Sequence, residues 1–370
     1  MNVVYDLRYA TDHFPGIGTH AHALLTALLA LPGKDRYRVV WGESDRTTRF
    51  DLDVLSRHPR VDWTVVREPS MGWNAVVATG GLLRRLGGDV YLSPFYLRPL
   101  GAPMPSVLTL FDVMYLTPVP GIPAGVRLRS WLAMRRARGA AAVITSSEFA
   151  RGQLIEHGFP TGRIHVVRLA LPPVRPGAAQ RPPRAPERPF ALVVGINRPH
   201  KGLRTLVNAW KSFGAEGPLD LVSAGPIDAR YPSLADLARE AGAAGTHTLG
   251  AVTPGELEWL YANATLLVFA TRHEGFGLPL LEAAGRGVPV VASDIPALRE
   301  IGDGVARFVP PDDALAWSSA VRDLAGDAPA RTRMAADGRA LAARHDYAAV
   351  AARTRDILES VARTAERAAS

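Results

Sequence analysis

The stretch LLVFATRHEGFGLPLLEAAGRGVPVVASD, from Leu266 to Asp294, decides the fold of this chain. It predicts a strand, a glycine-rich loop, a helix and a second strand, which together make one βαβ unit. The first strand is apolar throughout, as a parallel strand covered by helices on both faces must be. The sequence therefore favours an α/β protein built on parallel sheets.

The loop and helix of this unit carry its chemistry. Gly275 and Gly277 let the backbone turn sharply and expose N–H groups, and Pro279 suits the first turn of a helix. The start of that helix offers unpaired N–H donors and a positive dipole end, which favour a phosphate. Glu274 and Glu282 flank this anion site, which suits a sugar nucleotide with hydroxyls at both ends and phosphates between them. The alternative is an ordinary βαβ unit whose acids merely favour a helix N-terminus.

The composition is that of a globular protein with excess positive charge. A length of 370 residues suggests two domains, and 47% hydrophobic with 21% charged residues is typical of soluble chains. The net charge of +8 favours an anionic partner, but no dense basic run dominates and we expect no nucleic acid. The lack of cysteine excludes disulfides and thiolate sites. Because no secretory signal or apolar run of about 20 residues is present, we expect a cytoplasmic protein.

The alternating strand and helix pattern is interrupted by a proline-rich segment that cannot form a packed element. We therefore expect an N-terminal Rossmann-like domain over residues 1–172, a linker over 173–189 and a second such domain over 190–345. In the first domain, Gly16 and Gly18 precede a helix expected from about Thr19 to Leu31. Asp112 and Tyr115 follow a strand that begins at Ser106, at the edge where open α/β sheets bind ligands. The alternative for Asp112 is to cap the next turn.

Two further segments carry positive charge. Arg198 and Lys201 follow the strand 190–194 and precede a helix, so they form a second candidate anion edge, unless they are ordinary surface cations. The segment 126–139 predicts an amphipathic helix rich in arginine that also contains Trp131. This helix suits peripheral contact with anionic lipid headgroups, and a solvated arginine face is the alternative.

In pattern and order, these residues resemble the retaining glycosyltransferases of family 4, which have GT-B architecture. The E-x7-E pattern of Glu274 and Glu282, with its glycines and proline, is the most specific part. The matching segments in chain order are Pro15–Gly18, Ile144–Phe149, Val193–Gly195, Lys201–Gly202, Leu249–Gly250, Leu260–Ala264 and Glu274–Ala283. The resemblance implies two Rossmann-like domains facing each other across a cleft. It also implies a last helix, over 346–370, that crosses back to the N-terminal domain.

The resemblance further implies a site and a reaction. A sugar would move from an NDP-sugar, with GDP, UDP or dTDP as carrier and mannose or a 6-deoxy sugar as cargo, to an acceptor hydroxyl with retention of configuration. The acceptor would be a glycan, a lipid-linked molecule or a small natural product, and no metal or other cofactor is expected. The implied catalytic residues are Glu274, Lys201 and Asp112; the donor-binding residues are Gly16, Gly18, Arg198, Lys201, Glu274, Gly275, Phe276, Gly277, Leu278 and Glu282; the acceptor and sugar pocket contains Phe111 and Tyr115.

This sequence departs from the family at Phe111, where a histidine near the C6 hydroxyl of the sugar is common. A phenyl ring cannot donate a hydrogen bond, so we hypothesise a 6-deoxy donor, whose methyl group would suit it. The alternative is that another group takes over the contact.

Three rival functions stay open. An oxidoreductase would need G-x-G-x-x-G directly after a strand, which is not present. The same architecture also hosts phosphorylases and epimerases. Release of free nucleotide without glycosylation of an acceptor would favour one of these enzymes. The third rival is a non-catalytic nucleotide-sugar-binding protein, and the loss of the usual histidine at Phe111 is the only hint of it.

Overall fold

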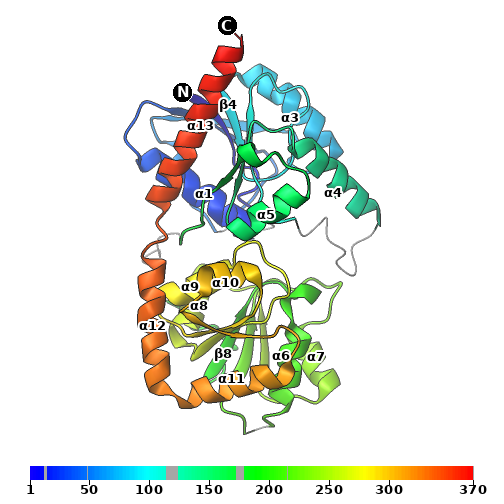
Figure 1. Cartoon of the computed structure of the whole chain (residues 1–370), viewed down its shortest axis with the longest axis vertical. Helices are drawn as coiled ribbons and strands as arrows, with labels where there is room; N and C mark the ends of the chain where they lie inside the picture. The colour runs from blue at the N-terminus through cyan, green and yellow to red at the C-terminus, as the bar shows by residue number, and fades with distance from the viewer. Residues whose placement is uncertain (12–14, 48, 114–123, 172–178, 215, 370) are drawn as a thin grey trace. The chain divides into compact units, whose positions relative to one another are not determined.

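The computed structural model describes residues 1–11, 15–47, 49–113, 124–171, 179–214 and 216–369. The chain divides into two compact units, each described here by itself (Figure 1). Unit 1 contains Met1–Pro172 and Asp346–Ser370, and unit 2 contains Pro173–His345. No described helix has the length and apolar character needed to cross a membrane.

Unit 1 is built on a parallel sheet with strand order β3-β2-β1-β4-β5-β6-β7. The strands are β1 (Asn2–Asp6), β2 (Arg36–Gly42), β3 (Val61–Val66), β4 (Val90–Ser93), β5 (Ser106–Thr109), β6 (Ala142–Thr145) and β7 (Ile164–Val166). The helices are α1 (Pro15–Ala30), α2 (Asp53–Ser56), α3 (Trp73–Leu86), α4 (Ala124–Ala137), α5 (Glu148–Glu156), the 3₁₀ turn η2 (Thr161–Arg163) and α13 (Tyr347–Ala369). Strands β1, β4, β5 and β6 are almost entirely buried, which accounts for their apolar sequences.

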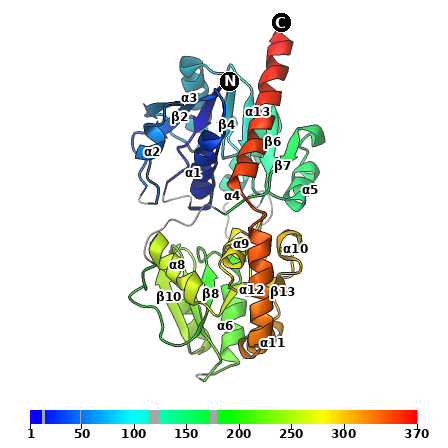
Figure 2. The same ribbon diagram turned by 90° about the vertical axis from the view of Figure 1, so that its left-hand side faces the viewer.

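Helix α13 completes the core of unit 1, although it lies far from the rest of that unit in sequence. It runs beside α1 in both views (Figures 1 and 2). Val350, Ile357 and Leu358 are buried in the same cluster as the strand residues Val3 and Val39. The apolar face of this helix is therefore part of the core and not an added surface.

Unit 2 has a second parallel sheet, with strand order β10-β9-β8-β11-β12-β13. The strands are β8 (Phe190–Val194), β9 (Asp220–Ala224), β10 (Thr246–Gly250), β11 (Leu266–Phe269), β12 (Val290–Ser293) and β13 (Ala306–Val309). The helical elements are η3 (Pro199–Lys201), α6 (Leu203–Lys211), α7 (Leu234–Ala241), α8 (Pro254–Asn263), α9 (Leu278–Gly285), α10 (Pro296–Gly302), α11 (Ala314–Gly326) and α12 (Ala328–Ala342). Figure 2 shows α12 lying along α9. The predicted fold class, two α/β units with parallel sheets, is confirmed.

Local signals in the sequence explain several element boundaries. The hydroxyl of Thr253 accepts from the backbone N–H of Glu256, whose carboxylate accepts from the N–H of Thr253, so α8 begins with a capping box. Pro279 lies in the first turn of α9, as predicted. Residues 179–189 form no helix or strand and lie on unit 2, where Gln180 donates its N–H to the carbonyl of Gly255.

Candidate functional site

Two loops meet at the carboxyl edge of the unit 2 sheet, because β8 and β11 are neighbouring parallel strands. Residues 195–202 follow β8 and residues 270–277 follow β11. The N–H of Arg272 donates to the carbonyl of His200 over 2.7 Å. Gly202 has φ of +66°, and a Cβ at this position would lie 1.9 Å from the carbonyl oxygen of Ala270. Only glycine permits this approach, so the two loops form one continuous surface.

Lys201 and Glu274 form an ion pair across these two loops. Nζ of Lys201 lies 2.5 Å from Oε1 of Glu274, and each side chain is 17% exposed. The same Nζ lies 5.4 Å from the centre of the Phe269 ring, within the range of a cation–π contact. The structure thus brings together two residues that the sequence assigns to the donor. Both side chains remain accessible, and their partial burial strengthens the electrostatic interactions that they make.

The N-terminus of α9 lies next to this ion pair. Gly277 is the N-cap with φ of +111°, and a Cβ there would lie 2.4 Å from Cδ2 of Leu298. The side chain of Phe276 is buried, with its ring centre 6.1 Å from that of His345. With its side chain anchored, Phe276 leaves its backbone at the start of the helix, where the first N–H groups have no intrahelical acceptor. This end of α9 is suited to an anion.

Glu282 is in the middle of α9, where its carboxylate is held by a neighbouring helix. The hydroxyl of Tyr261, on α8, donates to Oε2 of Glu282 over 2.7 Å. Tyr261 is fully buried, and burial together with the charge of Glu282 raises the pKa of its phenol well above the usual value. The phenol therefore stays protonated and acts as a donor. In the sequence, Tyr261 stands out only as part of the family segment Leu260–Ala264, which does not predict its contact with Glu282.

More cationic groups surround Lys201. Arg198 has its Nε 3.9 Å from a carboxylate oxygen of Asp228, and that Nε is buried without a hydrogen-bond partner among the described residues. Asp228 is itself bonded to Arg230, which lowers the pKa of this carboxyl to about 2. Burial, Lys201 and Arg198 lower the pKa of His200 to about 3, so its ring is neutral at pH 7. The incomplete pairing of Arg198 leaves positive charge that suits a diphosphate.

A shallow hollow lies at the ends of β8, β9 and β10, beside Lys201. Its lining includes the apolar side chains of Ile196, Pro226 and Ile227. Asn197 shapes one wall, because its Oδ1 accepts from the N–H of Asp228 over 2.6 Å and its Nδ2 donates to nearby carbonyls. An apolar hollow next to a cation fits a planar base attached to a phosphate.

In unit 1, the predicted start of the first helix was wrong. Helix α1 begins at Pro15, so Gly16 and Gly18 lie in its first turn and not in the preceding loop. A Cβ on Gly18 would lie 3.1 Å from Cα of Ala10, whereas Gly16 has open space around it. Gly18 therefore lets the helix approach the backbone after β1. Glycine disfavours a helix because it loses more backbone entropy than other residues, so the sequence alone favoured a later helix start.

Phe111 and Asp112 follow β5, at the carboxyl edge that the sequence predicts, and both are half-buried. The ring of Phe111 packs edge-on against His20 of α1, with 5.2 Å between ring centres. Burial lowers the pKa of His20 to about 4, so this imidazole is neutral at pH 7. Sequence analysis did not single out His20, because nothing in the sequence relates α1 to the end of β5. Tyr115 lies outside the described residues.

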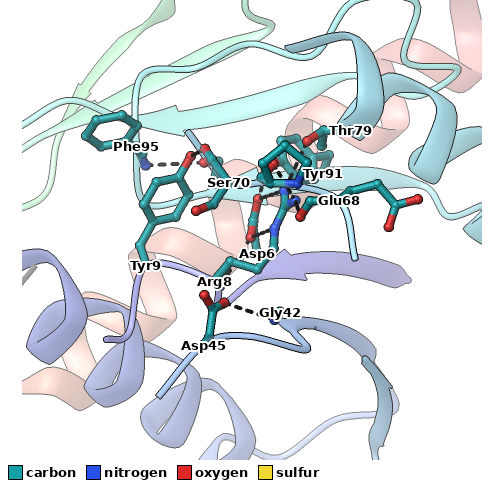
Figure 3. A network of polar contacts seen from close by, with 12 residues as sticks. Asp6, Arg8, Tyr9, Gly42, Asp45, Glu68, Ser70, Thr79, Tyr91 and Phe95 are labelled. Atoms are coloured by element: carbon teal, nitrogen blue, oxygen red, sulfur yellow. Dashed lines mark hydrogen bonds and ion pairs between the residues drawn. The ribbon is translucent and has the colours of Figure 1, made fainter. Parts of the chain in front are cut away.

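A buried polar network fixes the same edge of unit 1 (Figure 3). Arg8 donates to both carboxylate oxygens of Asp6, over 2.8 Å from Nε and 2.6 Å from Nη2, and the two side chains are 2% and 0% exposed. The hydroxyl of Tyr91 donates to the same carboxylate over 2.6 Å. Nη1 of Arg8 donates to the carbonyls of Glu68 and Pro69. The ends of β1 and β4 are thereby tied to the loop that follows β3.

Tyr9 extends this network with aromatic contacts. Its hydroxyl donates to the carbonyl of Ser70 over 2.7 Å, and its ring stacks on Phe95 with 4.8 Å between centres. Phe95 in turn lies 4.2 Å from Tyr96. The loops after β1 and β4 are therefore packed together through aromatic rings.

Comparison with known proteins agrees with the parallel α/β units. Residues 188–327 match the family described as glycosyl transferases group 1. Over 194 residues the chain is 29% identical to the O-antigen chain mannosyltransferase B of Escherichia coli, covering 48% of this chain and 49% of that protein. Over 141 residues it is 34% identical to the D-rhamnosyltransferase WbpZ of Pseudomonas aeruginosa, covering 36% and 35%. The chain thus spans half or less of the length of these relatives.

A solved structure shows the same fold over nearly the whole chain. HepE of Anabaena, crystallised with UDP and glucose, superposes with a TM-score of 0.70 at 17% identity, covering 97% of this chain and 100% of that one. The GT-B fold that the resemblance implies is confirmed. Residues 188–327 match the group 1 glycosyl transferases, and membership of the retaining family 4 stays a prediction. That segment includes Lys201, Glu274 and Glu282.

Proposed function

We propose that this protein is a retaining glycosyltransferase that moves a sugar from an NDP-sugar to an acceptor hydroxyl. The observation that carries the proposal is the Lys201–Glu274 pair, 2.5 Å apart and accessible at the sheet edge where α9 begins. A cation and a carboxylate side by side suit a ligand that is anionic at one point and rich in hydroxyls at the next. The E. coli and P. aeruginosa relatives, named as sugar transferases, support this reading.

The donor is assigned to the edge of unit 2. In this proposal Lys201 and Arg198 bind the diphosphate, Glu274 contacts the sugar, and Glu282 binds the ribose. The hollow next to Lys201 receives the base. The remaining contacts come from Gly275, Phe276, Gly277 and Leu278, in the loop before α9 and at its start. HepE, whose crystals contain UDP and glucose, supports a nucleotide sugar as the class of donor.

The reaction exchanges one bond at the anomeric carbon for another on the same face. The bond from this carbon to the diphosphate oxygen breaks as the bond to the acceptor oxygen forms. The acceptor proton passes to the leaving diphosphate oxygen. Lys201, Arg198 and the N-terminus of α9 stabilise the charge that develops on the diphosphate. Asp112, Phe111 and Tyr115 are assigned to the sugar and acceptor side, and the proposal invokes no metal.

A panel of GDP-, UDP- and dTDP-linked hexoses, each with its 6-deoxy counterpart, tests this function. Because Phe111 is apolar and packs on the neutral ring of His20, we expect the best 6-deoxy donor to react about tenfold faster than its hexose. The relative named as a D-rhamnosyltransferase supports a 6-deoxy sugar. Product analysis by NMR gives the anomeric configuration.

Other outcomes of this panel would count against the proposal. Clear preference for the hexose would remove the 6-deoxy assignment while keeping the transferase. An inverted product would exclude retention. Nucleotide release without glycosylation of glycan, lipid-linked or small-molecule acceptors would favour a phosphorylase or epimerase, and binding without turnover would favour a non-catalytic protein.

We also propose that α4 attaches the protein peripherally to the inner face of a membrane. Leu128 and Trp131 are 59% and 43% exposed, and the guanidinium of Arg135 lies 5.5 Å from the Trp131 ring centre. An exposed apolar side chain flanked by arginines suits an interface rich in anionic lipid.

In sedimentation with vesicles, W131Q is expected to weaken binding to phosphatidylglycerol membranes about tenfold. The substitution removes the apolar indole surface that the membrane would bury. L315Q changes a 76% exposed leucine of unit 2 and should leave binding unchanged. Equal binding of wild type and W131Q, or wild-type binding to purely phosphatidylcholine vesicles at the same strength, would contradict this proposal.

A further inference from the structure

The carboxylate of Glu282 is held by a partly buried contact between two helices. Tyr261 is 0% exposed and reaches from α8 to α9, where its hydroxyl donates to Oε2 of Glu282 over 2.7 Å. A phenol has one proton, and here the acceptor of that proton is a carboxylate oxygen. The bond therefore orients Oε2 of the Glu282 side chain.

Arg286 in turn fixes Tyr261. Its guanidinium lies 4.9 Å from the centre of the Tyr261 ring, and its Nη1 donates to the backbone carbonyl of Glu282 over 3.0 Å. Its Nε donates to Oε2 of Glu258 over 2.8 Å, and its Nη2 bonds the other oxygen of that carboxylate. Arg286 and Glu258 are both largely shielded from solvent. One guanidinium therefore joins α8 to α9 beside the tyrosine.

We infer that Tyr261 is a positioning residue for Glu282, and that through it the protein distinguishes ribonucleotides from 2′-deoxyribonucleotides, which selects GDP or UDP over dTDP among the candidate carriers. This inference rests on the proposed function, which assigns Glu282 to the ribose. A glutamate side chain without this support would have to be immobilised each time a nucleotide binds, which typically weakens affinity up to about tenfold. A carboxylate already oriented binds the ribose hydroxyls without that loss.

The shape of the contact predicts a specific defect. Removing the phenol oxygen leaves the ring in place beneath Arg286, so the packing of α8 on α9 is preserved. The carboxylate of Glu282 keeps its charge but loses the donor that orients its Oε2. Contacts with the hydroxyls of the ribose should suffer, whereas contacts of the diphosphate with Lys201 and Arg198 should not. The loss should therefore appear for ribonucleotides and hardly at all for their 2′-deoxy forms.

The experiment measures dissociation constants of GDP, UDP, dGDP and dUDP by calorimetry for the full chain and its variants. Wild type is expected to prefer the ribonucleotide of its better base. Y261F should lower that preference about tenfold with nearly unchanged affinity for the 2′-deoxy form. Y37F is the matched control, since Tyr37 is a buried tyrosine of unit 1 whose hydroxyl has no hydrogen-bond partner among the described residues. Its preference should equal that of wild type.

A second variant separates failure of the inference from failure of the proposed function. E282Q removes the carboxylate charge itself and should also abolish the preference. If E282Q retains it, Glu282 does not bind ribose and that assignment of the proposed function is wrong. If E282Q loses it while Y261F keeps it, or if Y261F weakens both nucleotide forms equally, the positioning role of Tyr261 is overturned. Should Y261F fail to fold, R286Q removes the guanidinium clamp and is expected to lower the same preference.

Discussion

Replacing Glu274 with alanine should lower the rate of sugar transfer by about 10²–10³-fold while reducing nucleotide affinity less than tenfold. In the proposed function this carboxylate contacts the transferring sugar, where charge develops in the transition state. Its loss also releases Lys201 from an ion pair of 2.5 Å, so the ammonium stays available to the diphosphate. The two measurements separate the role of Glu274 in sugar transfer from its role in nucleotide binding.

The measurement compares initial rates of product formation with the donor found in the panel, and nucleotide binding by calorimetry. E240A is a suitable control, because Glu240 is an exposed glutamate of unit 2 paired with Arg204 at the surface. It should leave both quantities unchanged. A turnover for E274A equal to that of wild type would refute the role of Glu274 in transfer.

Replacing Arg8 with methionine should lower the free energy of unfolding of unit 1 by about 3–5 kcal/mol. The substitution leaves the carboxylate of Asp6 fully buried without its cation, and the remaining neutral donors, the Tyr91 hydroxyl and the backbone N–H of residue 8, cannot compensate for the lost charge. The loop that follows β3 also loses two donors, because Arg8 bonds the carbonyls of Glu68 and Pro69. Thermal and urea unfolding monitored by circular dichroism measures the change.

The double variant D6L/R8M tests whether the buried charge is the cause. It removes both ions, so it should cost less than the sum of D6L and R8M measured singly. R57M is the surface control, since Arg57 and Asp53 are 79% and 75% exposed and their pair should contribute less than about 1 kcal/mol. If R8M is as harmless as R57M, the network of Figure 3 does not stabilise this edge.

The sequence predicted those features that arise from neighbouring residues. The apolar strand Leu266–Phe269 and the proline at the start of α9 each depend on a few adjacent positions, and the structure has them where expected. The placement of Lys201 next to Glu274 also follows from local patterns, because both residues succeed parallel strands. Parallel strands place their carboxyl ends at one edge.

Features that depend on packing between distant elements could not be predicted in this way. Tyr261 and Glu282 are separated by a strand, and only the packing of α8 on α9 brings them together. The backbone at Ala10 comes so close to α1 that position 18 suits a glycine, and no short window of sequence reveals this contact. The contact of His20 with Phe111 likewise joins α1 to the end of β5. The site is therefore predictable in its charged residues and not in the side chains that hold them.

The return of α13 to unit 1 has a consequence for synthesis on the ribosome. Unit 2 is one continuous segment, so it can close its core as soon as α12 has emerged. Unit 1 begins first but must wait, because Val350, Ile357 and Leu358 of α13 fill its core. During that interval the α1 surface that receives α13 is exposed to chaperones and to neighbouring chains. The unit that is translated first is thus the one that folds last.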